Sequence, residues 1–250
     1  MFLTRTANLL CDAALALVYP QSCAVCSGSV ESRAYGVACA GCWKQTLTFT
    51  GDETSCWKCG ALTSGIVAKE KREQVRCRRC DQEAFTVARA CGVYEGALRA
   101  SVLALKREPH ICTRLTELLV QAQRRAPLNE ATRIVAVPLH PKREKGRGFN
   151  QGAVIGRELS RLTGLPLDEV SVVRTSYSER HRAGMDERGR RETVENAFQV
   201  RRFNLIAGER ILLVDDVFTT GATVSSCAKC LKGAGAKDVF VLTIARPLHY

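Results

Sequence analysis

The residues best suited to chemistry lie in one segment, which begins at Ile211 and reads I-L-L-V-D-D-V-F-T-T-G-A-T-V. Its four leading apolar residues are typical of a strand buried on both faces, and the adjacent acids Asp215 and Asp216 follow them. Residues 219–223 then read T-T-G-A-T and open a predicted helix. The N-terminus of a helix offers free N–H groups and the positive end of its dipole to a phosphate, and Gly221 lets the backbone approach that phosphate closely.

Two carboxylates beside this phosphate cradle are suited to bind a sugar diol. Open α/β sheets bind ligands at the carboxyl ends of their strands, where Asp215 and Asp216 are expected. The segment therefore predicts a site for a ribose 5-phosphate. A buried strand that ends in one capping Asp would account for only one of the acids. A receiver domain with a phosphorylated aspartate would need acids from other strands and would leave the threonine loop unexplained.

Cysteines form a second set of candidate ligands. Eight of the thirteen stand in four C-x-x-C pairs, with 12, 13 and 17 residues between successive pairs: Cys23/Cys26, Cys39/Cys42, Cys56/Cys59 and Cys77/Cys80. Two such turns complete a tetrahedral four-cysteine zinc site, and four sulfur ligands leave no open position for water or substrate. We therefore expect two structural Zn²⁺ ions, rather than redox dithiols or buried free thiols. Sequential pairing, first with second and third with fourth, is favoured over an interleaved cross-brace.

Cysteine usage also bears on the compartment. An odd total and the absence of a secretion signal favour a reducing cytoplasm and metal ligation over disulfides. The apolar residues 9–18 follow Arg5 but are interrupted by Asp12, so we expect a short amphipathic helix there rather than a signal peptide. No run reaches the roughly 18 apolar residues that a transmembrane helix needs. Cys227, in a predicted helix, is expected in the core.

The charge balance favours polyanionic partners. Lys and Arg number 37 against 25 Asp and Glu, a formal net charge of +12, which eight thiolates with two Zn²⁺ would lower to about +8. Four arginines crowd the fourth cysteine pair: Arg72, Arg76, Arg78 and Arg79. Compensation of thiolate charge on a solvated surface is slightly favoured over a nucleic-acid contact. Aromatic residues are only 6%, which argues against a base-stacking platform.

Hydrophobic patterning divides the chain into two predicted domains. Residues 1–83 hold the N-terminal helix and a double zinc ribbon, and residues 84–250 alternate strand and helix patterns. The predicted strands lie at 85–93, 134–137, 170–173, 211–214 and 239–244, and the predicted helices at 98–105, 115–123, 154–162 and 224–231. This alternation is the signature of an α/β fold with a parallel sheet.

The Asp-Asp and T-T-G-A-T segment resembles the phosphoribosyl pyrophosphate (PRPP) motif of type I phosphoribosyltransferases. Three further features resemble the ComF family, also called competence protein F or GntX-like proteins. Residues 137–140 read V-P-L-H, residues 147–151 read R-G-F-N-Q, and residues 94–96 read Y-E-G ahead of a Leu-Lys pair at 105–106. A cysteine-rich region ahead of the transferase domain is the usual layout of that family. The resemblance implies a type I phosphoribosyltransferase-like parallel sheet with a small N-terminal zinc-ribbon domain.

The resemblance also implies a site for PRPP with Mg²⁺. Asp215 and Asp216 would hold the ribose hydroxyls, and Lys106 joins them as a catalytic candidate, with helix capping as its alternative role. The residues expected to bind the 5-phosphate are Thr219, Thr220, Gly221, Ala222 and Thr223. Lys142 and Arg143, expected in a loop after the strand at 134–137, would lie near the pyrophosphate and stabilise its charge; a solvated surface is the alternative for this basic run.

The acceptor is left open, because many relatives carry Gln where His181 stands and Asn where Thr193 stands. The arginine-rich region between them is expected to form a hood over the acceptor. Two functions compete. One is a phosphoribosyltransferase that uses PRPP. The other is a non-catalytic zinc-ribbon adaptor that binds single-stranded DNA or a DNA-uptake helicase, since the family resemblance is linked to natural transformation.

Overall fold

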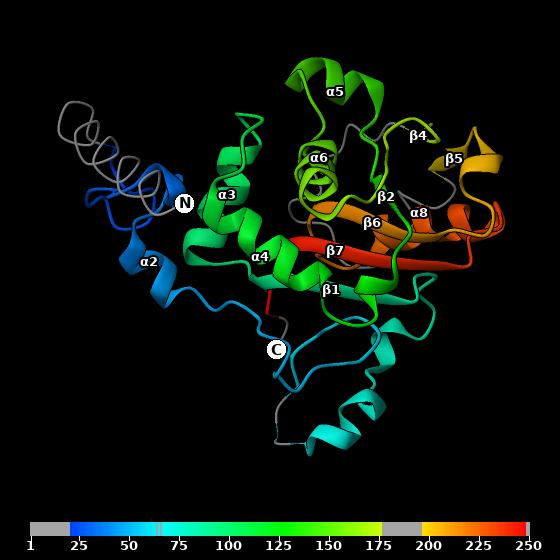
Figure 1. Ribbon diagram of the computed structural model, residues 1–250, viewed down its shortest axis with the longest axis horizontal. Helices are drawn as coiled ribbons and strands as arrows, with labels where there is room; N and C mark the ends of the chain where they lie inside the picture. The colour runs from blue at the N-terminus through cyan, green and yellow to red at the C-terminus, as the bar shows by residue number, and fades with distance from the viewer. Residues whose placement is uncertain (1–20, 64, 66, 177–196, 249–250) are drawn as a thin grey trace.

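The computed structural model describes residues 21–63, 65, 67–176 and 197–248 (Figure 1). The predicted N-terminal helix lies outside these described residues, as do His181, Thr193 and the arginine-rich region between them.

A five-stranded parallel sheet with the order β1-β7-β6-β2-β3 forms the centre of the fold. Its strands are β1 (Val87–Val93), β2 (Arg133–Ala136), β3 (Leu167–Asp168), β6 (Arg210–Val217) and β7 (Asp238–Arg246). The predicted parallel α/β sheet is therefore confirmed. The apolar residues of β6 are buried on both faces: Leu212 and Val214 belong to one core, and Ile211 and Leu213 to the other.

Helices cover both faces of this sheet (Figure 1). One face carries α3 (Gly96–Leu105), α4 (Thr113–Gln123) and α6 (Gln151–Thr163), and the other carries α8 (Ala222–Gly233). Asn150 caps the start of α6 by accepting a hydrogen bond from the N–H of Gly152, and α6 ends as predicted at Gly164, which has a positive φ of 76°. The shorter helices are α2 (Ala40–Gln45), α5 (Pro141–Arg147) and the 3₁₀ helices η1 (Arg33–Tyr35), η2 (Lys69–Gln74), η3 (Arg78–Cys80), η4 (Leu128–Glu130) and η5 (Phe203–Leu205).

The strand predicted at 170–173 is not part of the parallel sheet. It forms β4 (Val172–Arg174), which pairs antiparallel with β5 (Phe198–Val200) in a separate two-stranded sheet. Asp168, at the end of β3, accepts hydrogen bonds through Oδ1 from the N–H groups of Val170 and Ser171. This side-chain turn redirects the chain away from the edge of the sheet before β4 begins.

Residues 142–147 form most of helix α5, not the loop that was predicted. Pro141 occupies the first turn of α5, and Gly148 ends the helix with a φ of 85°. The strand predicted to end at residue 214 also continues to Val217, because Asp215 and Val217 keep their pairing with β7.

The two cysteine-rich segments lie on opposite sides of edge strand β1. Cys39, Cys42 and Trp43 share a core with α3 and α4, whereas Cys56, Cys59 and Cys80 share the core on the α8 side. Between them, the backbone at residues 47–49 and at residue 58 hydrogen-bonds to β1. The ribbons therefore cover an edge that would otherwise expose unpaired backbone groups. The domain boundary at residues 83/84 stays a prediction.

Candidate phosphate loop and cysteine sites

The predicted ligand site lies where the strand order reverses. β2 and β6 are neighbours, but the chain continues from β2 to one side of the sheet and from β6 to the other. Ala136 is in register with Val214, and the N–H of Val137 donates to the Val214 carbonyl at 3.0 Å. Such a reversal opens a crevice at the carboxyl ends of the strands, which is the usual ligand site of open α/β sheets.

Asp215 and Asp216 stand at this reversal, and the structure brings Lys106 to them. The Lys106 Nζ lies 3.5 Å from Asp216 Oδ2, and Asp215 Oδ1 accepts a hydrogen bond of 2.9 Å from the Asp216 N–H. Lys106 follows the last residue of α3. Its side chain therefore reaches an acid at the predicted site, in addition to its place at the helix end.

The electrostatic setting of Asp215 is unusual for a carboxyl group. Burial, and then the neighbouring charge of Asp216, raise the pKa of Asp215 to about 8, while Arg174 and Lys106 act in the opposite direction. Arg174 is buried on β4, with its guanidinium carbon 5.5 Å from the centre of the Phe198 ring. No sequence pattern around Arg174 predicts a role for it, because nothing local indicates that β4 leaves the sheet and approaches these acids.

The predicted phosphate loop leads directly into α8. Gly221 has a φ of 84° and precedes Ala222, the first residue of the helix. Thr220 Oγ1 accepts a hydrogen bond of 3.4 Å from the Ala222 N–H. A Cβ on Gly221 would lie 2.8 Å from Cζ of Phe218, so both backbone conformation and space require glycine here. The strand, loop and helix predicted around residues 211–224 are confirmed.

The R-G-F-N-Q motif has a structural role at the ends of β2 and β6. Asn150 Nδ2 donates to the Val137 carbonyl at 3.0 Å, while Asn150 Oδ1 accepts from Gly152. A Cβ on Gly152 would lie 3.0 Å from the Val214 carbonyl oxygen. The motif thus fixes the start of α6 against the ends of β2 and β6. Lys142 and Arg143 are exposed on α5, within the connection that leaves the carboxyl end of β2.

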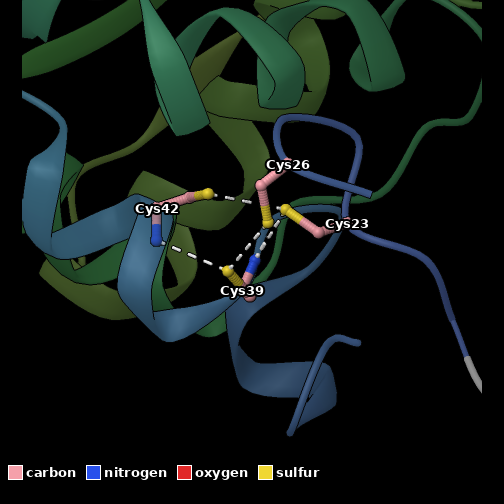
Figure 2. A group of neighbouring side chains, drawn as sticks. All are labelled: Cys23, Cys26, Cys39 and Cys42. Atoms are coloured by element: carbon pink, nitrogen blue, oxygen red, sulfur yellow. Dashed lines mark hydrogen bonds between the residues drawn. The ribbon is translucent and has the colours of Figure 1, made fainter. Parts of the chain in front are cut away.

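The first four cysteines form a compact group. Figure 2 shows the side chains of Cys23, Cys26, Cys39 and Cys42 gathered together. Their sulfur atoms all lie within 4.8 Å of one another. The Sγ atoms of Cys23 and Cys42 are 3.7 Å apart, as are those of Cys26 and Cys39. Because Zn–S bonds are about 2.3 Å long, a tetrahedral site has S–S edges of about 3.8 Å. The geometry fits a structural zinc ion.

The remaining four cysteines form a second group with the same geometry. The Sγ atoms of Cys56 and Cys80 are 3.5 Å apart, as are those of Cys59 and Cys77. Sequential pairing is therefore confirmed, and the interleaved scheme is excluded. Among the described residues, neither group includes a fifth cysteine, and Cys227 is buried in the core, as predicted.

In each group one cysteine has a lowered pKa, which favours its thiolate form. Hydrogen bonding from the Cys59 side chain is the largest cause that lowers the pKa of Cys56, to about 4. Burial alone would raise the pKa of Cys23, but backbone N–H groups of Cys26, Cys39 and Val25 outweigh it and lower that pKa to about 6. Thiolates are the form that binds zinc.

The arginines near the second group have different roles. The guanidinium carbon of Arg76 lies 4.6 Å from the centre of the Trp57 ring, and Arg72 pairs with Asp52 at 3.6 Å. Arg78 and Arg79 are exposed. Arg76 is exposed as well, but its guanidinium lies over the Trp57 ring.

Comparison with known proteins agrees with this architecture. Residues 14–81 match a double zinc ribbon domain, and residues 150–250 match a phosphoribosyl transferase domain. The DNA utilization protein YhgH of Escherichia coli K12 is 31% identical over 240 residues, which cover 93% of this chain and all of that protein. The chain belongs to the ComF family. Competence protein F of Haemophilus influenzae is 28% identical over 90% of this chain and 96% of that protein.

Another member of the ComF family matches over a shorter region. Competence protein ComFC of Streptococcus pneumoniae is 37% identical over 114 residues, which cover 45% of this chain and 47% of that protein. Within the part of the chain that the structure describes, no helix is both long and apolar enough to cross a membrane.

Proposed function

We propose that this ComF-family chain is a phosphoribosyltransferase that binds PRPP with Mg²⁺ between β6 and α8. The observation that carries the proposal is the geometry at one point of the sheet. Two adjacent acids, an acid-paired lysine and the glycine-threonine start of a helix all lie at the reversal of strand order.

Each part of this site matches one part of PRPP. The carboxylates of Asp215 and Asp216 accept hydrogen bonds from the two ribose hydroxyls. The 5-phosphate accepts from the N–H groups at the start of α8 and from the threonine hydroxyls, a site formed by Thr219, Thr220, Gly221, Ala222 and Thr223. Lys106, Lys142 and Arg143 supply positive charge at the pyrophosphate end, where the bond between C1 and the pyrophosphate oxygen breaks as a bond to the acceptor forms.

The paired carboxylates also suit a hard cation such as Mg²⁺, which prefers oxygen ligands. When bound with PRPP, Mg²⁺ would neutralise charge on the leaving pyrophosphate. Structural Zn²⁺ at both cysteine groups completes the proposed set of metals.

We further propose that the protein acts in the cytoplasm in the use of imported DNA. The support is the relatives' names, which refer to DNA utilization and competence, and the prevalence of metal-ligand cysteines over disulfides.

A non-catalytic adaptor is the alternative function, and one observation favours it. Arg78 and Arg79 are exposed on η3 beside the second cysteine group, on a chain with a formal net charge of +12. An exposed basic patch beside a zinc ribbon suits single-stranded DNA or a DNA-uptake helicase.

Pyrophosphate release separates the two functions. Wild-type protein with PRPP and Mg²⁺ is screened against nucleobases, ammonia and single-stranded DNA as acceptors. A transferase releases pyrophosphate only with PRPP and one acceptor, and the variant D215N/D216N loses that release while R161Q, on the exposed end of α6, keeps it. DNA binding without any release would favour the adaptor.

A further inference from the structure

The second cysteine group and the phosphate loop face each other across a cavity. This cavity of about 380 Å³ has Phe218, Thr219 and Thr220 on one side. The other side is lined by ribbon residues: Cys59, Ala61, Leu62, Thr63, Cys77, Arg79, Cys80 and Glu83. The loop therefore faces open space on this side, and a side chain that crosses from one wall to the other can help to hold it in place.

Arg246 is the side chain that joins the two walls. It is the last residue of β7 and is buried, with only 6% of its surface exposed. Its Nη1 donates a hydrogen bond to the Cys59 carbonyl, and its guanidinium carbon lies 5.2 Å from the centre of the Phe218 ring. One guanidinium thus contacts both the second ribbon and the first residue after β6.

Phe218 in turn determines the space available to Gly221. The ring of Phe218 meets Phe85 edge to face, with 5.8 Å between ring centres. It lies so close to Gly221 that a Cβ there would be 2.8 Å from Phe218 Cζ. Any shift of this ring changes the support beneath the loop that precedes α8.

Positively charged side chains lie beside the second cysteine group, which is negatively charged when it holds zinc. A zinc ion with four thiolates carries a net charge of about −2. Two cations lie beside the second group, the buried Arg246 and the half-buried Arg89. Burial lowers the pKa of Arg246, while the negative charge of the Cys59, Cys77 and Cys56 thiolates opposes that shift. Arg89 Nη1 donates to the Trp57 carbonyl at 2.8 Å. Arg89 thus joins the ribbon to β1, whereas Arg246 joins the ribbon to Phe218.

We propose that Arg246 is a positioning residue that holds Phe218, and with it the phosphate loop, against the second cysteine group. The inference rests on the proposed function only in taking this loop as the site of the PRPP 5-phosphate. It assigns the second ribbon a task beyond covering the edge of β1: the ribbon anchors the loop through one buried guanidinium.

Hydrogen exchange of zinc-loaded, ligand-free protein tests the proposal. The variant R246A is compared with R89A, which also removes a guanidinium bound to a ribbon carbonyl, although Arg89 is only half-buried. With two zinc ions per chain in both proteins, we expect amides of residues 218–224 to exchange at least about fivefold faster in R246A and at the wild-type rate in R89A. The variant R246K keeps the charge without the planar group, so an intermediate rate is expected, and it provides the test if R246A does not fold.

Titration with PRPP and Mg²⁺ gives a second readout. R246A should bind about tenfold more weakly than wild type, and R89A should bind as wild type does. Loop exchange in R246A that is no faster than in R89A would overturn the positioning role, whatever PRPP does. Wild-type protein that does not bind PRPP, together with faster loop exchange in R246A, would contradict the proposed function while supporting the positioning role.

Discussion

At the scale of single residues, Asp215 shows how the proposed site works against stability. Burial and Asp216 raise its pKa to about 8 in the folded protein, whereas an unfolded chain has a value of about 3.9. Between these two values the folded state binds the proton more tightly than the unfolded state. Stability therefore falls as the pH rises from about 4 to about 8. Such a cost is expected where a side chain is kept for binding rather than for folding.

The substitution D215N should remove this cost, because an amide cannot ionise. Compared with wild type, the variant should melt at a higher temperature, and the difference should be several degrees larger at pH 9 than at pH 6. Thermal unfolding of both proteins at the two pH values provides the measurement. A difference that does not change between pH 6 and pH 9 would show that Asp215 does not titrate in this range.

Gly221 gives a second prediction at this scale. G221V combines a strained positive φ with a collision between the new side chain and Phe218, so PRPP binding should fall at least about tenfold. Gly208 is a matched control, since its φ is 78° and a Cβ added there would meet no neighbour within 4 Å. G208V should lose about 1–3 kcal/mol of stability and keep PRPP affinity. Equal losses of affinity in both variants would assign the effect to strain alone.

At the scale of elements, the sequence predicted those strands and helix ends that depend on residues close together in the chain. The continuous apolar runs of β6 and β7 indicated central strands, Gly164 indicated the end of α6, and the T-T-G-A-T segment indicated the start of α8. Pro141 and Gly148 also suit the start and the end of helix α5, but the run of charged residues between them predicts a loop.

Other features depend on partners that are distant in the sequence. The apolar run at β4 carries no information on which strand it will pair with. The turn in which Asp168 accepts hydrogen bonds from Val170 and Ser171 directs the chain away from the sheet. Arg246 meets Cys59 across more than 180 residues, so no spacing rule could have placed it beside the zinc ligands.

The cysteine groups lead to a prediction at the element scale. C39S removes one ligand from the first group and should lower the zinc content from two ions per chain to one. Structural zinc contributes on the order of 10 kcal/mol per site, so the first ribbon should unfold and expose Trp43, which is buried against α3 and α4. Elemental analysis and tryptophan fluorescence test this. Wild-type protein with less than one zinc per chain would refute both sites.

At the scale of the whole molecule, the arginines near the second cysteine group differ in what they contact. Arg72 and Arg76 are engaged with Asp52 and Trp57, which leaves the exposed pair Arg78 and Arg79 as the clearest candidates for a polyanion. The variant R78A/R79A should bind single-stranded DNA more weakly, and the slope of log affinity against log salt should become shallower by about 1–2. An unchanged slope would assign these arginines to a solvated surface.

The architecture as a whole supports the binding of PRPP at one site. Sheet topology, the two acids and the start of α8 suit a ribose and a phosphate at the same crevice. Each charge-assisted hydrogen bond contributes roughly 1.5–3 kcal/mol, so replacing both acids by amides should weaken binding about ten- to several-hundredfold.

Calorimetric titration of PRPP with Mg²⁺ into zinc-loaded wild-type protein and D215N/D216N is the most direct measurement of this claim. We predict saturable binding to the wild type with one PRPP per chain, and the stated loss of affinity in the double variant. Wild-type protein that gives neither heat nor thermal stabilisation at millimolar PRPP would contradict the account and favour the zinc-ribbon adaptor.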